Sequence, residues 1–215
     1  QTLGYDPSWH TFIRAAVITS PIFRNISVTH VDAPTIVNRG DTVSGRANVN
    51  VTVQNNGMMT ESFFDVWVCA EGVEFGRQSV VGLASGAQIT ITFPWNTTGY
   101  TWGNYTIEAY AENLIGETTY GDNYLLYGDV LVKLIGDLGS RVGSTNTFGA
   151  FDGAVTSTDL SLFLQCYKGI APLGYMYLGD LGSRVGSTNT FFAYDGSVTS
   201  TDLSLFLICF KGGGP

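Results

Sequence analysis

The residues of this chain best placed to do chemistry are aspartates that recur at the same positions of two nearly identical segments. Residues 136–169 return as residues 179–212, and 29 of the 34 aligned positions are identical. None of the five differences falls on an acidic position. Aspartate carboxylates bind hard cations, and they also accept hydrogen bonds at turns and helix N-termini. The aspartates of these repeats could therefore either bind a cation or accept hydrogen bonds at turns and helix N-termini.

Other arrangements that would indicate catalysis are missing from the sequence. It has no Gly-x-Ser-x-Gly elbow, no phosphate-binding glycine loop and no cysteine and histidine at catalytic spacing. Cys69, Cys166 and Cys209 form no CxxC pair, and His10 and His30 do not complete a zinc or haem site. We therefore expect a protein that is not an enzyme. Equivalent repeat positions could bring Cys166 and Cys209 together, but buried thiols are the simpler expectation.

Composition indicates a β-rich protein. Hydrophobic residues make up 44% of the 215 positions and charged residues only 13%, which suits many short strands. A formal net charge of −8 disfavours binding to nucleic acid and leaves cations as the partners the chain attracts. No apolar run approaches the roughly 20 residues that span a bilayer. We expect a mature secreted chain that meets the cell surface without a membrane span.

Each repeat is predicted to end in a short helix. Thr156 precedes Asp159 by three residues, and Thr199 precedes Asp202 in the same way, which is the pattern of a capping box. The helices that follow are apolar on nearly all sides. They should therefore pack on each other and also against the upstream domain or another subunit.

Residues 22–134 are predicted to form one antiparallel β-sandwich. Valines alternate with polar residues over 47–54, and Asn55-Asn56-Gly57 supplies a turn. The same period of two returns over 64–68, 89–93 and 105–109.

Two resemblances to known families refine this division. Residues 48–72 and 88–124, with the strand Gly103–Ile107 and the closing motif Glu117–Asn123, resemble the CARDB-type immunoglobulin-like domains of archaeal and bacterial surface proteins. The two repeats resemble dockerin modules, which pair a calcium loop with a helix and occur in twos. The resemblance implies an N-terminal extension at 1–21, a sandwich at 22–134, and a repeat pair at 135–215.

Resemblance to the dockerin loop implies a calcium site in each repeat. The Asp-Gly step fits loop positions 5 and 6, and positions 1 and 3 then fall on Phe148 and Ala150, or on Phe191 and Ala193, which lack side-chain ligands. Asp137 and Asp180 could replace them if the intervening residues loop out. The implied ligands of the two repeats are Asp137, Asp152, Ala154, Thr156 and Asp159, and Asp180, Asp195, Ser197, Thr199 and Asp202. The alternative is that these aspartates only cap turns and helices.

Four Asn-x-Ser/Thr sequons predict N-linked glycans, at Asn25, Asn50, Asn96 and Asn104. Strand alternation places Asn25, Asn50 and Asn104 opposite apolar neighbours, so we expect them to face solvent.

An apolar, β-prone segment precedes the sandwich and contains Phe12, Ile13, Ala15, Val17 and Ile18. It must pair either with an edge of its own sandwich or with that of a neighbouring subunit. We favour donation to a neighbour, which predicts a surface filament or pilus-like polymer of a structural glycoprotein. The alternative is a binding or adhesion module that recognises a cohesin-like partner or carbohydrate.

Overall fold

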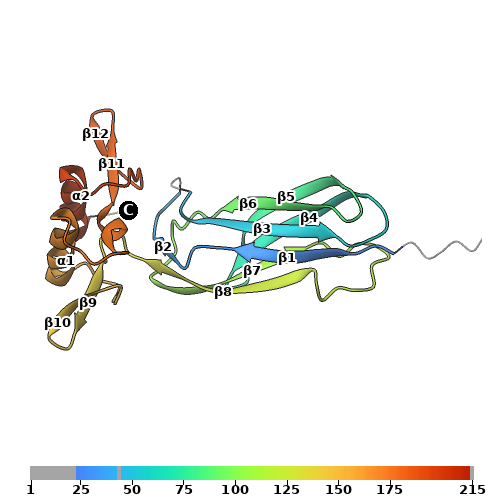
Figure 1. Ribbon diagram of the computed structural model, residues 1–215, viewed down its shortest axis with the longest axis horizontal. Helices are drawn as coiled ribbons and strands as arrows, with labels where there is room; N and C mark the ends of the chain where they lie inside the picture. Colours follow the sequence, from blue (N-terminus) through green and yellow to red (C-terminus); the bar gives the residue numbers. More distant parts are fainter. Residues whose placement is uncertain (1–22, 43–44, 214–215) are drawn as a thin grey trace, which may run out of the picture.

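The computed structural model describes residues 23–42 and 45–213, which form a β-sandwich followed by a pair of small repeats (Figure 1). The sandwich is long, and the first described residues lie at its end farthest from the repeats (Figure 1). The predicted assembly residues Phe12, Ile13, Ala15, Val17 and Ile18 lie outside this part of the chain.

Two sheets make up the sandwich. One contains, in order, β1 (Ile26–Asp32), β3 (Asn48–Asn55) and β6 (Gln88–Pro94). The other contains, in order, β2 (Ile36–Asn38), β8 (Tyr124–Lys133), β7 (Gly103–Ala111), β4 (Glu61–Ala70) and β5 (Val73–Leu83). Neighbouring strands are antiparallel except β2 and β8, which are parallel.

The core of the sandwich follows from the alternating sequence. Val49, Val51 and Val53 of β3 are fully buried, and they face a layer that includes Phe64 and Ile107 of the other sheet. The polar residues between the valines lie on the outer face of the sheet. The prediction of a mainly β, immunoglobulin-like sandwich is thereby confirmed.

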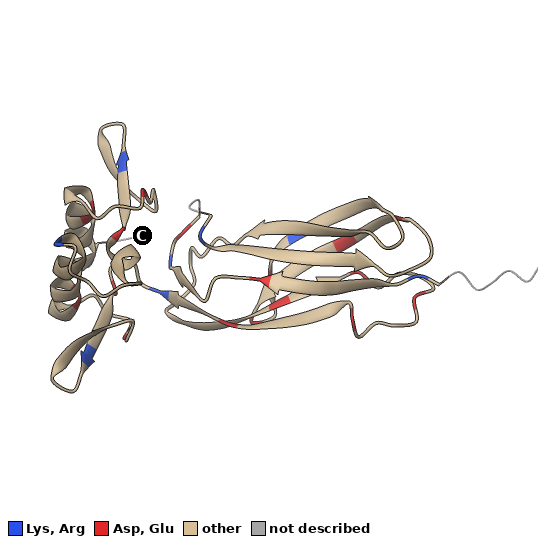
Figure 2. Ribbon diagram, viewed as in Figure 1, with Lys and Arg blue, Asp and Glu red and all other residues tan. Residues whose placement is uncertain are grey.

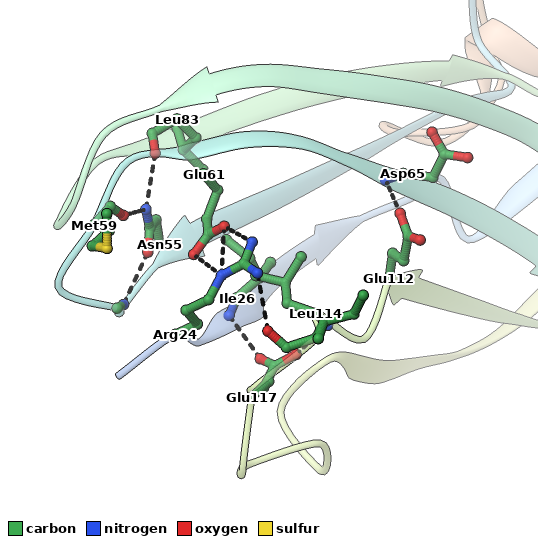
Figure 3. Close-up of polar contacts among 12 residues, drawn as sticks. Arg24, Ile26, Asn55, Met59, Glu61, Asp65, Leu83, Glu112, Leu114 and Glu117 are labelled. Carbon is green, nitrogen blue, oxygen red and sulfur yellow. Dashed lines mark hydrogen bonds and ion pairs between the residues drawn. The ribbon is translucent and has the colours of Figure 1, made fainter. Parts of the chain in front are cut away.

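The loop between β7 and β8 closes the sandwich along β1. The buried Glu117 carboxylate accepts hydrogen bonds from the backbone N–H groups of Ile26 (2.9 Å) and Leu114 (2.8 Å), as Figure 3 shows. The side chain of Asn123 donates to the same carboxylate at 3.0 Å. The acidic and amide positions of the closing motif therefore hold the loop against the first strand.

Each repeat is a hairpin followed by a helix. The hairpins are β9 (Gly139–Val142) with β10 (Thr145–Phe148), and β11 (Gly182–Val185) with β12 (Thr188–Phe191). They point in opposite directions from the helices α1 (Ser157–Tyr167) and α2 (Ser200–Phe210) (Figure 1). A short 3-10 turn at Met176–Gly179 leads into the second repeat. Both helices begin with the predicted capping box, at Thr156 and Thr199.

The two repeats pack together about an approximate two-fold axis. Phe163 of α1 stacks on Phe206 of α2 with ring centroids 4.7 Å apart, and both rings are fully buried. Each helix also covers the glycine that opens the other repeat. A Cβ atom on Gly179 would lie 2.7 Å from the Cβ of Cys166, and one on Gly136 would lie 3.1 Å from the Cβ of Cys209. These glycines allow the two copies to approach each other.

Not every apolar side chain of the helices is covered. Several remain exposed on the helices and just after α1: Tyr167, Ile170, Leu207, Ile208 and Phe210. The prediction that both helices are buried on most sides is therefore only partly correct in the single chain. The exposed side chains are available for the contact with another subunit that the sequence analysis considered.

We predict that Gly179→Ala destabilises the repeat pair by about 1–3 kcal/mol, because the added methyl group overlaps Cys166 in a packed core. Urea unfolding followed by circular dichroism measures this difference. Gly121→Ala is the control, since its methyl group meets no atom within 4 Å. Equal stability of the two variants would contradict the packing described here.

Candidate docking site between the sandwich and the repeats

The last aspartate of each repeat is an internal clamp. Asp159 is fully buried, and its Oδ1 accepts hydrogen bonds from the backbone N–H groups of Leu138 (2.8 Å) and Gly139 (3.1 Å). Its Oδ2 accepts from the backbone N–H (2.7 Å) and hydroxyl (3.0 Å) of Thr156. Asp202 makes the same four contacts in the second repeat. Each carboxylate thus joins the helix N-terminus to the start of its repeat.

The first aspartate of each repeat is buried but incompletely bonded. The residues after Asp137 loop out as the β9–β10 hairpin, so that its Oδ2 accepts from the Gly153 N–H at 3.0 Å. Asp180 accepts from Gly196 in the same way. Within the described chain, Oδ1 of both aspartates is buried without a hydrogen-bond partner. These two carboxylates therefore need compensation from elsewhere.

The sandwich brings a cation to both repeats. Basic residues lie at the end of the sandwich that faces the repeats (Figure 2). The guanidinium of Arg46 contacts Asp180 Oδ2 at 3.1 Å. Lys133, at the end of β8, is buried, and its Nζ donates to the backbone oxygens of Leu134 (3.2 Å) and Asp137 (3.0 Å). Asp180 thus forms an ion pair with the sandwich, whereas Lys133 contacts Asp137 through its backbone oxygen.

An aromatic ring accompanies each cation. Lys133 Nζ lies 5.3 Å from the centroid of the Phe151 ring, and the Arg46 guanidinium lies 3.7 Å from that of Tyr194. Phe151 and Tyr194 occupy equivalent repeat positions and are one of the five differences between the copies. The tyrosine hydroxyl accepts a hydrogen bond from Asn38 Nδ2 at 2.6 Å. Cation–π contact adds to the electrostatic attraction at both places.

Burial sets the titration of the acidic and basic groups. It raises the pKa of Asp137 and Asp180 above the ordinary range of aspartate, while the charges of Lys133 and Arg46 oppose the shift. Burial also lowers the pKa of Lys133, and the charge of Asp137 partly offsets this effect. When the repeats pack against the sandwich, these charged groups therefore lose contact with water and gain oppositely charged neighbours across the junction.

Close packing completes the junction. The indole of Trp102 covers Gly153, where a Cβ would lie 2.8 Å from its ring. The cavity beside Arg46, Asp180 and Tyr194 measures only about 60 Å³. That is well below the roughly 300 Å³ typical of a pocket for an organic ligand. A second cavity at the junction measures about 280 Å³, and its lining includes Arg39 of the sandwich side and Val155, Cys209 and Phe210 of the repeats.

Of the residues implied as calcium ligands, the structure brings Asp137 next to the Asp152–Gly153 turn and Asp180 next to the equivalent turn. Asp159 and Asp202 are fully engaged by hydrogen-bond donors, and Thr156 and Thr199 cap the helices. Asp152 and Asp195 are exposed and accept from the N–H groups of Ala154 and Ser197. In the described ranges, no three Asp, Glu, His or Cys side chains are grouped to hold a metal ion. The donor set does not fit a dockerin site, and calcium in the repeats stays a prediction.

The sequons occupy different surroundings. Asn96 and Asn104 are exposed and Asn50 is half-buried. Asn25 is only 5% exposed, and its Nδ2 donates to Asp122 Oδ2 at 3.0 Å. The expectation that Asn25 faces solvent is therefore wrong. The β7–β8 loop covers this edge of β1, which alternation along β1 alone does not reveal.

All three cysteines are buried free thiols. Cys166 and Cys209 lie at equivalent positions but do not pair with each other. Burial raises the pKa of the Cys166 and Cys209 thiols to about 11. They act as small packing groups against the opposite repeat.

Sequence reasoning missed the docking cations. Lys133 directly precedes the first repeat, so a lysine that ends an apolar strand before a Gly-Asp motif was one available signal. Arg46 is 134 residues from Asp180 in the sequence, and no local pattern connects them.

Comparisons with known proteins agree with this fold. The CARDB family model matches residues 32–126. The CARDB domain of a Pyrococcus furiosus protein, crystallised in complex with di-metal ions, is 26% identical with a TM-score of 0.44, and the match covers 52% of this chain and 96% of that one. A domain of a provisionally assigned cell surface protein from Methanosarcina acetivorans is 21% identical with a TM-score of 0.42, covering 52% and 93%. No curated protein sequence matches the chain.

The fold is that of an immunoglobulin-like domain, and the chain contains a CARDB domain at residues 32–126. The first part of the predicted resemblance is thereby confirmed. The likeness of the repeats to dockerins stays a prediction.

We predict that Arg46→Ala destabilises the docked protein by about 1–3 kcal/mol. The substitution leaves the Asp180 carboxylate buried without its cation, and the loss is smaller than for a fully buried pair because the Arg46 side chain is 42% exposed. Adding Asp180→Asn to this variant should recover part of the stability, because it removes the unpaired charge. Urea unfolding followed by circular dichroism measures both changes.

Arg77→Ala is the matched control for this experiment. Arg77 is similarly exposed and also stacks on an aromatic ring, Trp67, but its acidic partners Glu74 and Asp65 are in contact with solvent. Its loss should cost less stability than the loss of Arg46, because solvent screens its ion pairs. Equal costs for the two arginines would show that docking does not depend on Arg46.

Proposed function

We propose that this chain is a non-catalytic structural subunit of an extracellular, pilus-like surface filament. In this polymer the N-terminal segment of one copy adds as a strand to the sandwich of the next. The CARDB domain fits an extracellular location. None of the described helices has the length and apolar character needed to cross a membrane.

The observation that carries this proposal is that apolar side chains are exposed at both ends of a long molecule. At the end where the described chain begins, Met58 and Met59 lie in the turn that follows β3, and the Met58 N–H donates to the Phe23 carbonyl at 2.9 Å. At the other end, the helix pair and the residues just after α1 expose the five side chains named above. Two different surfaces at opposite ends suit a head-to-tail contact, which repeats without closing.

The sandwich also offers an edge for an added strand. The outer edge of β1 is covered by the β7–β8 loop, whose Asp122 carbonyl accepts from the Val28 N–H at 2.7 Å. On β6, the side chain of Gln78 donates to the carbonyl of Thr92. By contrast, β5 is 11 residues long and pairs only with β4 among the described strands. Strand addition at β5 would satisfy backbone groups that are otherwise open.

Added strands would extend this sandwich and not complete it. Its core is already filled by its own strands, from Ile26 of β1 to Val132 of β8. Donation in this protein therefore relies on main-chain hydrogen bonds and surface side chains. Addition of the segment to an edge of its own sandwich remains the competing arrangement.

Deleting residues 1–20 should abolish filaments while leaving a folded monomer. Electron microscopy and sedimentation measure the assemblies, and circular dichroism checks the fold. Deletion of residues 1–7 is the control, because it keeps the apolar segment that follows Pro7. Assemblies of unchanged size after the longer deletion, or an intact chain that never assembles, would refute the proposal.

We further propose that the surface protein carries N-linked glycans, with Asn96 and Asn104 the most accessible acceptors and Asn50 next. The buried amide of Asn25 should remain unmodified. Intact mass and glycopeptide mapping of material from the native source would measure occupancy at each site. A mass equal to that of the bare polypeptide would contradict this prediction.

A further inference from the structure

Three oxygen atoms at the end of the sandwich where the described chain begins are buried without a hydrogen-bond donor. They are Oδ1 of Asn25, Asp122 and Asn123, and they have no partner within the described chain. Asn25 lies just before β1, whereas Asp122 and Asn123 close the β7–β8 loop. Leaving such acceptors unsatisfied costs free energy, so a missing partner is indicated.

The orientation of the Asn25 amide is fixed by its neighbour. Its Nδ2 donates to Asp122 Oδ2 at 3.0 Å, and Asn25 is only 5% exposed. Amide oxygen and nitrogen are bonded to the same carbon, so Asn25 Oδ1 lies beside the same carboxylate. Rotating the amide by 180° would place its oxygen against the carboxylate instead, which is repulsive.

Asn123 is oriented in the same manner. Its Nδ2 faces three oxygen acceptors: Glu117 Oε2 at 3.0 Å, Asn113 Oδ1 at 3.1 Å and the Glu112 carbonyl at 3.4 Å. At 3% exposure, the amide cannot turn its oxygen to bulk water. The unsatisfied Oδ1 is therefore the consequence of the surrounding acceptors and not of an arbitrary choice between nitrogen and oxygen.

The nearby positive charge is already used. The Arg24 guanidinium contacts the buried Glu61 carboxylate and donates to the Ile115 carbonyl at 2.9 Å (Figure 3). In the part of the chain that the structure describes, no Lys or Arg forms an ion pair with Asp122. Arg24 therefore neutralises Glu61, and Glu117 is met by N–H donors. The Asp122 carboxylate has one amide donor and keeps its negative charge.

We propose that Asp122, Asn25 and Asn123 bind a divalent cation, and that calcium is the ion their chemistry suits. Calcium is bound by carboxylate and amide oxygens together with water, in flexible geometry. A single buried water could donate to two of the three oxygens, but it would leave the negative charge uncompensated. The cation would fasten the β7–β8 loop to the start of β1. This site is separate from the repeats and does not depend on filament formation.

The test measures calcium binding to the full chain by isothermal titration calorimetry and thermal unfolding by tryptophan fluorescence. All four tryptophans precede residue 135, but Trp102 packs on Gly153 of the first repeat, so the signal reports both the sandwich and its junction with the repeats. In the wild type, calcium should raise the unfolding midpoint. Asp122→Asn should bind one calcium fewer per chain and lose this shift. Without calcium it should be as stable as the wild type or more so, because its new amide can donate to Asn25 Oδ1.

Asn25→Asp is the opposite variant. Without calcium, its second carboxylate repels Asp122 and should lower the midpoint, and calcium should restore it with a larger shift than in the wild type. Asp129→Asn is the matched control, because it removes the same charge from an exposed position and should respond to calcium like the wild type. The variant Asp137→Asn/Asp180→Asn separates any calcium bound by the repeats, and it should keep the sandwich response.

The proposal is overturned if calcium leaves the wild-type midpoint unchanged, which is the outcome expected of a buried water. It is also overturned if Asp122→Asn binds as much calcium as the wild type, or if calcium fails to stabilise Asn25→Asp. Because Asn25→Asp gains from calcium where Asp122→Asn loses, poor folding of either variant does not remove the test. Filaments are scored separately by microscopy, so the two proposals can fail independently.

Discussion

A carboxylate that leaves water must be met by hydrogen-bond donors or by a cation, and the joints of this protein are built around that requirement. Glu117 accepts backbone N–H groups from both β1 and its own loop, and so closes the sandwich. Asp159 accepts four donors and so closes its repeat. Asp180 accepts Arg46 from the other domain. In a chain with so few charged residues, these acids decide which segments meet.

Duplication explains how a small repeat pair acquires a core. Each helix contributes one phenylalanine to the central stack and one cysteine to the glycine of the other copy. Neither repeat could bury these surfaces alone. The approximate two-fold symmetry of the repeats is lost where the pair contacts the sandwich, because each repeat contacts different residues of the sandwich. Lysine meets Phe151 on one side, whereas arginine and asparagine meet the hydroxyl-bearing Tyr194 on the other.

Local patterns predicted the elements whose causes are local. Alternating valines gave β3, and the threonine-to-aspartate spacing gave both capped helices. Long-range pairing was beyond such reasoning. The sequence around Asn25 alternates as expected of a strand, yet its side chain is covered by Asp122, 97 positions away. The role of Arg46 also could not be predicted from the sequence, because it depends on the angle at which the repeats meet the sandwich. The hairpins β9–β10 and β11–β12 could be predicted only as residues that loop out after Asp137 and Asp180, and their direction could not be predicted.

Docking also limits how the repeats can meet another molecule. The surface formed by Asp137, Phe151, Asp180 and Tyr194 is already occupied by the sandwich of the same chain. A partner in trans would have to displace Arg46 and leave a buried carboxylate unpaired, which is costly. Side chains of α2 that are exposed to water, such as Leu207 and Ile208, carry no such penalty. Covering these apolar groups gains free energy without breaking an existing contact. The internal ion pair therefore directs any association of the repeats to the helices, at the end of the molecule opposite the first strand.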